Sequence, residues 1–374
     1  MNWLYTGFFA SILLALCAGS RVRFVLSNNI KINRKEKNYN SFFTFLFFGL
    51  LTFIAVCRED FVDTWDYRYM YEQIGPNIEN AFNDTVPRVE KGYLFITALL
   101  NKISTDSQFL LIVFGILTIL CFSAVILKYS ESVSFSLILF SCNMWISCMN
   151  GLRQIFVASL ISLVGALWIS ANTSKKKIFG FICLVLLLST IHTSALFAIP
   201  FYFMAKGKFF NKWIIGFCFI TLLLFLIPPF YNLIFELMSA AGLSYGNMLD
   251  TESSMGVPRL IISAAPMLLC LIYYYLNPSK EQDKTITWMM NLILIGFLFS
   301  ILSLKMVYFS RMRMYFNIFS TITLPYVVNK LFVKEQRVLI TCIINVLYIA
   351  IFLYQLTAYG DEVTNFRLFF ETFK

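Results

Sequence analysis

Charged side chains are scarce in this sequence of 374 residues. They make up 13% of it, whereas hydrophobic residues make up 59% and phenylalanine alone occurs 41 times. Soluble domains carry about 25% charged residues, so a composition this apolar excludes an ordinary soluble protein. The sequence therefore predicts an integral membrane protein of the all-α, polytopic class.

The chain also lacks the motifs of metal, disulfide and nucleotide sites. Its nine cysteines lie mostly in apolar segments, and none stands in a CxxC or another metal-ligand spacing. We interpret them as small buried hydrophobes. No Rossmann, P-loop or zinc pattern occurs. We expect no cofactor. A divalent ion at the aspartates of the polar segment 58–91 is the alternative.

Basic residues outnumber acidic ones by 30 to 20, but their distribution does not suggest nucleic-acid binding. They gather in short clusters between apolar runs, which is the positive-inside pattern of membrane proteins. Eighteen of them lie in the segments 20–38, 128–131, 171–177, 206–212, 277–285 and 330–337. We expect these segments on the cytoplasmic side, and both termini on the outer side. The first apolar stretch lacks a basic n-region, so we expect an uncleaved first helix.

Apolar runs long enough for spanning helices recur along the chain. We predict twelve of them, at residues 3–19, 41–57, 107–127, 132–149, 152–170, 178–191, 194–206, 213–231, 258–276, 286–304, 314–331 and 338–357. The short pair 178–191 and 194–206 is expected to meet at a sharp bend. Residues 92–101 are too few to span and are predicted to form a re-entrant or interfacial helix. The whole chain, 1–374, is predicted to be one membrane domain.

A polar loop, 58–91, interrupts this apolar background on the outer side. Between Cys57 and Tyr93 lie eight acidic and four basic residues. Clusters of aromatic and acidic residues suit sugars, because rings stack on sugar faces and carboxylates accept hydroxyl hydrogen bonds. On a helix the three aspartates, three residues apart, would share one face. The candidate sugar-binding residues are Asp60, Asp66, Trp65, Tyr67 and Tyr71, with Asp63 as the third aspartate. A merely solvated acidic loop is the alternative.

Several arginines lie at helix ends on the side where the positive-inside rule disfavours them. An interfacial arginine costs free energy unless an anion meets it, and the guanidinium fork suits phosphate. Internal pairing with loop acids is the competing explanation. Arg153 is the sharpest candidate, because it starts a helix whose N-terminus adds backbone donors for an anion. The others are Arg58, Arg259, Arg311 and Arg313.

His192 is the only histidine in the chain. It falls at the predicted bend, which places it at the same outer level as Arg153. An imidazole there can accept a proton from a hydroxyl, although a lone histidine is often only structural.

Four short motifs, taken in order, resemble the EpsG family, a branch of the bacterial Wzy-type polymerases for O-antigen and exopolysaccharide. They are Asp63-Thr64 with Tyr67 and Tyr71, Glu90-Lys91-Gly92-Tyr93, Leu152-Arg153-Gln154 and His192-Thr193-Ser194-Ala195. The similarity covers about residues 1–330. One departure is visible: the glycine expected just ahead of the loop aspartate is absent from Asp60-Phe61-Val62-Asp63.

The resemblance implies a glycosyltransferase of GT-C-like architecture in the bacterial inner membrane, with its active site and both termini periplasmic. Such an enzyme transfers the growing glycan from undecaprenyl diphosphate to the terminal sugar of a lipid-linked repeat unit. The candidate diphosphate-binding residues are Arg153, Arg311, Arg313 and Arg58. His192 is the first candidate for the base, and Asp63 or Glu90 the second. A separate chain-length regulator is implied by the family only.

Three other activities compete with this interpretation. A flippase for lipid-linked oligosaccharide would need polar residues deep within its spans, and charges there are nearly absent. An O-antigen ligase uses the same donor on the same membrane side, and only the order of the motifs favours a polymerase. A membrane-bound O-acyltransferase is also built around a lone histidine, but it leaves the outer arginines unexplained.

Overall fold

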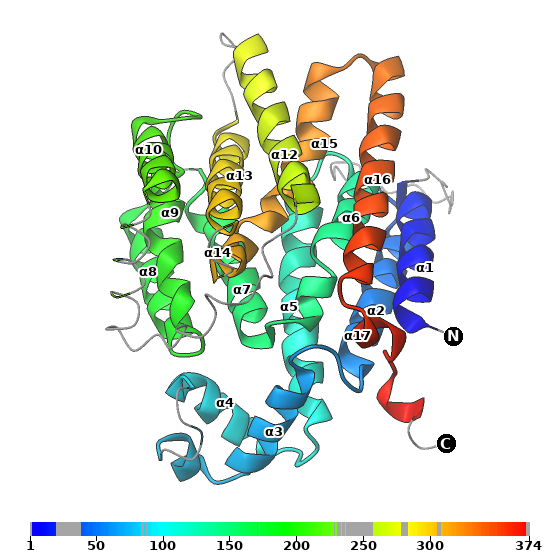
Figure 1. The fold of residues 1–374 in the computed structure, drawn as a ribbon, viewed down its shortest axis with the longest axis vertical. Helices are drawn as coiled ribbons and strands as arrows, with labels where there is room; N and C mark the ends of the chain where they lie inside the picture. Colours follow the sequence, from blue (N-terminus) through cyan, green and yellow to red (C-terminus); the bar gives the residue numbers. More distant parts are fainter. Residues whose placement is uncertain are drawn as a thin grey trace, which may run out of the picture.

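The computed structural model is a helical bundle with a small helical cap at one end (Figure 1). It describes residues 2–19, 39–83, 86, 89–171, 173–227, 229, 233, 236, 257–277, 283–304 and 308–371. Within these ranges the regular structure is helical, apart from one isolated β-bridge between Arg58 and Leu368. The all-α fold class is therefore confirmed.

The bundle helices follow the apolar runs of the sequence closely. Two of them, α1 (Trp3–Gly19) and α2 (Ser41–Cys57), match the predicted bounds residue for residue. The others are α5 (Gln108–Tyr129), α6 (Val133–Asn143), α7 (Leu152–Trp168), α8 (Lys175–Ser189), α9 (Ala198–Met204), α10 (Lys212–Leu226), α12 (Val257–Leu276), α13 (Lys284–Leu302), α15 (Asn317–Leu331) and α16 (Lys334–Thr357). Short pieces complete the fold: α14 (Tyr308–Met312), α17 (Asp361–Thr364) and the 3₁₀ turns η5 (Arg313–Tyr315) and η6 (Phe369–Glu371).

Some predicted spans are interrupted. The predicted helix 132–149 ends at Asn143 and is followed by the 3₁₀ turn η2 (Ile146–Met149). Trp145 explains the interruption: its indole is fully buried and donates to the Leu51 carbonyl at 3.2 Å, which anchors the chain to α2. The predicted helix 194–206 likewise divides into η3 (Thr193–Phe197) and α9. The end of the predicted helix 213–231 lies largely outside the described residues.

Several bundle helices turn apolar faces outward. On α10 the exposed side chains include Trp213, Phe219 and Leu222, and on α16 they include Val338 and Val346. Lipid is the solvent that such faces require. Three helices are long and apolar enough to cross a membrane, namely Gln108–Tyr129, Lys284–Leu302 and Lys334–Thr357, and seven apolar helices in the described residues have 10–17 residues. The chain is thus a membrane protein, and its twelve spans stay a prediction.

The polar loop folds into the cap. It contains α3 (Thr64–Ile74) and η1 (Ile78–Ala81), and the helix predicted at 92–101 is α4 (Lys91–Asn101). Asn101 donates to the Tyr71 carbonyl at 2.7 Å, and this bond joins α4 to α3. In Figure 1 these two helices lie below the end of α5. The loop is therefore an ordered structure that covers one end of the bundle.

The described residues near both termini lie toward the same end of the bundle as this cap (Figure 1). Asn2 donates to the Val363 carbonyl at 2.6 Å, and the Glu59 N–H donates to the Arg367 carbonyl at 2.9 Å. Basic connections meet at the opposite end, where Lys330 lies 3.6 Å from Glu131 and Lys206 donates to Thr173 at 2.6 Å. The basic segment 20–38 lies outside the described residues. In the described residues the cap and these basic connections lie at opposite ends of the bundle, and their sides of the membrane stay a prediction.

Candidate functional site

Glu90 joins three segments that are far apart in the sequence. Its Oε2 accepts a charge-assisted hydrogen bond from Arg153 Nη1. Its Oε1 lies 3.2 Å from His192 Nδ1, and it accepts bonds from the Thr193 backbone N–H at 2.9 Å and from the Thr193 hydroxyl at 3.1 Å. We call Glu90, Arg153, His192 and Thr193 the Glu90 cluster. It brings together three of the four catalytic candidates of the sequence, and the fourth, Asp63, lies beside it.

Local structure explains how Glu90 reaches its partners. Glu90 immediately precedes α4, and the Tyr93 N–H at the start of that helix donates to the Thr190 carbonyl at 3.2 Å. Gly92 lies directly against Thr190, so that a Cβ added there would stand 2.6 Å from the Thr190 carbonyl oxygen. This close approach holds the start of α4 against the bend between α8 and η3, where His192 lies.

Arg153 enters the cluster from the first turn of α7. That helix begins after Gly151, whose φ of +73° is a left-handed conformation that glycine adopts without strain. The Arg153 guanidinium stands over the ring of Tyr93, 5.1 Å from the ring centroid. A cation held over an aromatic ring gains about 0.5–2 kcal/mol. Arg153 is therefore fixed both by a carboxylate and by a ring.

The Glu90 cluster is half-buried, and its carboxylate is paired with a guanidinium. The side chains of Glu90, Arg153 and His192 are 19%, 18% and 14% exposed. Burial raises the pKa of Glu90, but the hydrogen bond from His192, the charge of Arg153 and the Thr193 N–H outweigh it and lower that pKa to about 2. Glu90 is therefore ionised at neutral pH, and as a carboxylate it is a weak base. The structure thus contains an internal ion pair between Arg153 and a loop acid, Glu90, which is the alternative to a bound anion as the partner of Arg153.

Asp63 borders the cluster from the other side. Its Oδ2 accepts the Gly151 N–H at 2.7 Å, which ties the loop to the start of α7. Burial raises the pKa of Asp63, and the Gly151 hydrogen bond and the charge of Arg58 only partly oppose this. Val62, just before it, has a φ of +53°. The family resemblance predicts a glycine at this position. Val62 stands there and adopts the left-handed backbone conformation that favours glycine.

The shared face predicted for the three aspartates is wrong. The helix α3 begins only at Thr64, so Asp60 and Asp63 precede it and Asp66 alone lies within it. Asp60 and Asp66 are exposed, whereas Asp63 is half-buried.

Both predicted sugar-binding tyrosines are also placed differently from the prediction. Tyr67 is 6% exposed and packs edge-on against Tyr93 with 6.2 Å between ring centroids. Tyr71 is fully buried, and its hydroxyl donates to the Ser104 carbonyl at 2.6 Å. Neither ring has a face on which a sugar can stack. Trp65, by contrast, is 60% exposed.

Arg58 is not available to a diphosphate in this structure. It is fully buried, its Nε donates to Thr64 at 2.8 Å, and its Nη1 donates to the Ala55 carbonyl. Burial lowers its pKa to about 10, although the nearby Asp63 opposes the shift. Its contacts give it a structural role: it joins the end of α2 to the start of α3.

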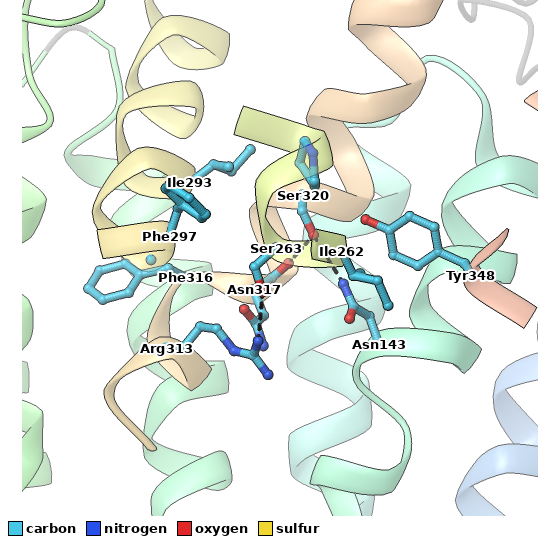
Figure 2. A pocket seen from close by; sticks show the side chains of 12 residues that line it. Asn143, Ile262, Ser263, Ile293, Phe297, Arg313, Phe316, Asn317, Ser320 and Tyr348 are labelled. Atoms are coloured by element: carbon cyan, nitrogen blue, oxygen red, sulfur yellow. Dashed lines mark hydrogen bonds between the residues drawn. The ribbon is translucent and has the colours of Figure 1, made fainter. Parts of the chain in front are cut away.

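The remaining arginine candidates differ in their exposure and contacts. Arg311 is exposed, and its carbonyl accepts a bond from Gln154 at 3.0 Å. Arg313 is half-buried and donates to Ser263 at 2.8 Å inside a cavity of about 30 Å³ among α6, α12, α13, α15 and α16 (Figure 2). This volume suits one or two waters rather than a diphosphate. The side chain of Arg259 lies outside the described residues.

Two sets of contacts at the candidate site were not predicted from the sequence. Thr193 supplies two of the donors to Glu90, and Gln154 connects the start of α7 to η3 and α14 through Ser194 and the Arg311 carbonyl. Thr193 and Gln154 each follow a candidate residue, His192 and Arg153. Their residue types and spacing do not predict which distant residues they contact in the fold. Among the described residues no group of three histidine, cysteine or acidic side chains is placed to hold a metal ion.

Comparison with known proteins identifies the family. The model of the EpsG family matches residues 41–369, which include the cap, the Glu90 cluster and most of the bundle. No curated protein and no solved structure gives a match. Because the match extends over most of the chain, this protein belongs to the EpsG family.

Proposed function

We propose that this protein is a polysaccharide polymerase, a Wzy-type glycosyltransferase of GT-C-like architecture. It would transfer a growing glycan from undecaprenyl diphosphate to the terminal sugar of a lipid-linked repeat unit. The reaction would take place at the periplasmic face of the bacterial inner membrane. Membership of the EpsG family supports this class of activity. The single observation that carries the proposal is the contact of one carboxylate, Glu90, with both an imidazole and a guanidinium at the capped end.

The pairing of Glu90 with His192 supports a general-base role for the histidine. A carboxylate that accepts a hydrogen bond from Nδ1–H fixes the imidazole tautomer and leaves the Nε2 lone pair free to accept a proton. With a pKa of about 2, Glu90 suits this positioning role better than that of the base. Asp63 stays the alternative base, because burial raises its pKa.

The proposed reaction exchanges one bond for another. The acceptor hydroxyl oxygen bonds to the anomeric carbon of the donor glycan, the carbon–oxygen bond to the lipid diphosphate breaks, and His192 takes the hydroxyl proton. Negative charge grows on the leaving diphosphate, so a nearby guanidinium stabilises the transition state more than the ground state. Arg153 is the first candidate for this role, and there the diphosphate would compete with Glu90 for its guanidinium. Arg311, which is exposed, is the second.

The test is polymerisation of purified lipid-linked repeat unit by the full chain in nanodiscs, with products sized on a gel. Loss of a general base costs about 10²–10⁴ in rate, and loss of a charge-stabilising donor costs about 10²–10³. We therefore expect His192→Ala and Arg153→Ala to abolish the product ladder. Lys334→Ala, an exposed cation at the opposite end, is the matched control and should leave the ladder unchanged.

Failure of the test would also be informative. If well-folded wild-type protein makes no ladder but translocates the lipid-linked unit in liposomes, the protein is a flippase. If it transfers the glycan only to lipid A core, it is a ligase. If His192→Ala polymerises at the wild-type rate while Asp63→Asn does not, the base has been misassigned.

A further inference from the structure

A second hollow lies at the capped end, between α3, the start of α5 and the C-terminal segment. Its volume is about 440 Å³, and its wall includes Glu59, Asp60, Trp65, Arg68 and Asp106. Cavities of roughly 300–1,000 Å³ are the usual size of small-molecule sites. We call it the Trp65 cavity. It is large enough for part of an extended chain.

One wall of the Trp65 cavity is aromatic. The indole of Trp65 is 60% exposed and is stacked on Tyr69, with 5.3 Å between ring centroids and an interplanar angle of 10°. The two residues are four apart on α3, a spacing that brings side chains together on a helix. The second face of the indole is left for an apolar surface to cover. The CH face of a sugar ring is a surface of this kind.

The other walls carry negative charge. Asp60 and Asp106 are exposed, Glu59 is half-buried, and none of the three forms an ion pair within the described ranges. Arg68 is the one cation of the wall. Its guanidinium donates hydrogen bonds to the Glu59 carbonyl at 3.0 Å, the Arg58 carbonyl at 3.2 Å and the Ser107 hydroxyl at 3.2 Å. Carboxylate oxygens are therefore the acceptors offered to a ligand. They bind hydroxyl or ammonium groups and repel other carboxylates.

We propose that the Trp65 cavity is a distal subsite for neutral or amino-sugar-bearing glycan, with Trp65 as the stacking surface and the three carboxylates as hydroxyl acceptors that exclude acidic sugars. This inference rests on the proposed function for its substrate class. Trp65 and Tyr67 are two positions apart on a helix and so point roughly 200° apart. Because Tyr67 faces Tyr93 and the Glu90 cluster, the subsite lies on the other face of α3 and holds sugars remote from the reacting end.

Exposed tryptophan and tyrosine also mark the membrane interface, which is the rival explanation for this pair. Bacterial membrane surfaces carry anionic lipids, which repel acidic protein surface. Asp60, Asp106 and Glu59 surround the indole, so charge disfavours its insertion among headgroups. A glycan has no such conflict with the carboxylates.

The test separates binding from turnover. Detergent-purified full-length protein is applied to a glycan array that contains neutral, amino and uronic-acid oligosaccharides. The variants are Trp65→Ala, the double variant Asp60→Asn/Asp106→Asn, and Trp213→Ala, an equally exposed tryptophan on α10 (64% exposed) as the matched control. We expect selective binding of neutral or amino glycans that Trp65→Ala weakens about tenfold, and that Trp213→Ala leaves unchanged. The double variant should newly tolerate acidic glycans.

Polymerisation by the same variants distinguishes the two proposals. Trp65→Ala should raise the KM for lipid-linked repeat unit with little change in kcat, whereas His192→Ala should keep glycan binding and lose turnover. Binding through Trp65 without any polymerisation by the wild type would leave the subsite standing and remove the proposed function. Binding that is absent, selective for acidic glycans or insensitive to Trp65→Ala would overturn the subsite. So would a Trp65→Ala protein that keeps glycan binding and loses only its partition into anionic vesicles.

Discussion

At the scale of single residues, the charge of Glu90 has an effect on stability that can be measured. Its pKa lies at about 2 in the folded protein, below the ordinary value of 4.5. A lowered folded-state pKa means that the folded state favours the ionised form. The stabilisation is therefore complete above about pH 4.5 and is lost as the pH falls toward 2. Since the side chain is only 19% exposed, solvent screens this contribution little.

We therefore expect Glu90→Gln to be less stable than the wild type at neutral pH, by on the order of 2–3 kcal/mol. The difference should shrink between pH 4.5 and pH 2, because the wild-type side chain then becomes neutral as well. Thermal unfolding of both proteins in detergent across this range measures it. Glu79→Gln, at an exposed position on η1, is the control and should follow the wild-type curve. A constant difference between Glu90→Gln and wild type across the range would contradict the assigned ionisation.

Val62 stores backbone strain that a single substitution can release. Its φ of +53° is unfavourable for a β-branched residue, and a left-handed residue costs roughly 1–2 kcal/mol. Glycine adopts this φ freely but loses more chain entropy on folding, about 0.5–1 kcal/mol. Val62→Gly should therefore raise the free energy of unfolding by about 0.5–1 kcal/mol. Val346→Gly, on the exposed face of α16, should lower it by about 1 kcal/mol. Chemical unfolding of the two variants compares them, and equal losses would mean that Val62 is unstrained.

At the scale of elements, the site depends on how closely α4 approaches the bend between α8 and η3. Gly92 permits this approach, since any Cβ there meets the side chain and the carbonyl of Thr190. Gly92→Ala should push α4 away from the bend, separate Glu90 from His192 and lower the polymerisation rate at least tenfold. Gly49→Ala is the matched control, because nothing lies within 4 Å of a Cβ at that position of α2. It should keep full activity. Equal activity of the two variants would show that the approach has no catalytic importance.

The contact between Gly92 and Thr190 could not be predicted from the sequence, whereas the bounds of several helices could. Hydrophobic runs predict the bounds of α1 and α2 because burial in lipid depends on local composition alone. They do not predict that α3 starts after Asp63, because that start depends on tertiary contacts such as the bond from Gly151. The sequence also singled out Glu90, Arg153 and His192 separately. Their meeting depends on the Gly92–Thr190 approach and on the packing of α7, neither of which has a local sequence signal.

At the scale of the whole molecule, the two chain ends and the cap share one end of the bundle. Asn2 contacts Val363, and Trp3 donates to Glu371 at 2.9 Å. We therefore expect both termini to lie on one side of the membrane, whatever the number of spans is. The positive-inside rule predicts that the end with the basic connections faces the cytoplasm. The cap and the Glu90 cluster should then face the periplasm.

Epitope tags test this topology directly. A tag fused after the last residue should be reached by antibody in intact spheroplasts, because the C-terminal segment pairs with the cap through Arg58 and Leu368. A tag inserted after Asn277, at the end of α12 among the basic connections, should be reached only after the membrane is permeabilised. The inserted protein must still polymerise, so that a misfolded chain is not read as a topology. If the C-terminal tag were protected in spheroplasts and the Asn277 tag were accessible, the Glu90 cluster would face the cytoplasm. A polymerase acting on periplasmic lipid-linked units would then be excluded, because its substrates and its base would lie on opposite sides of the bilayer.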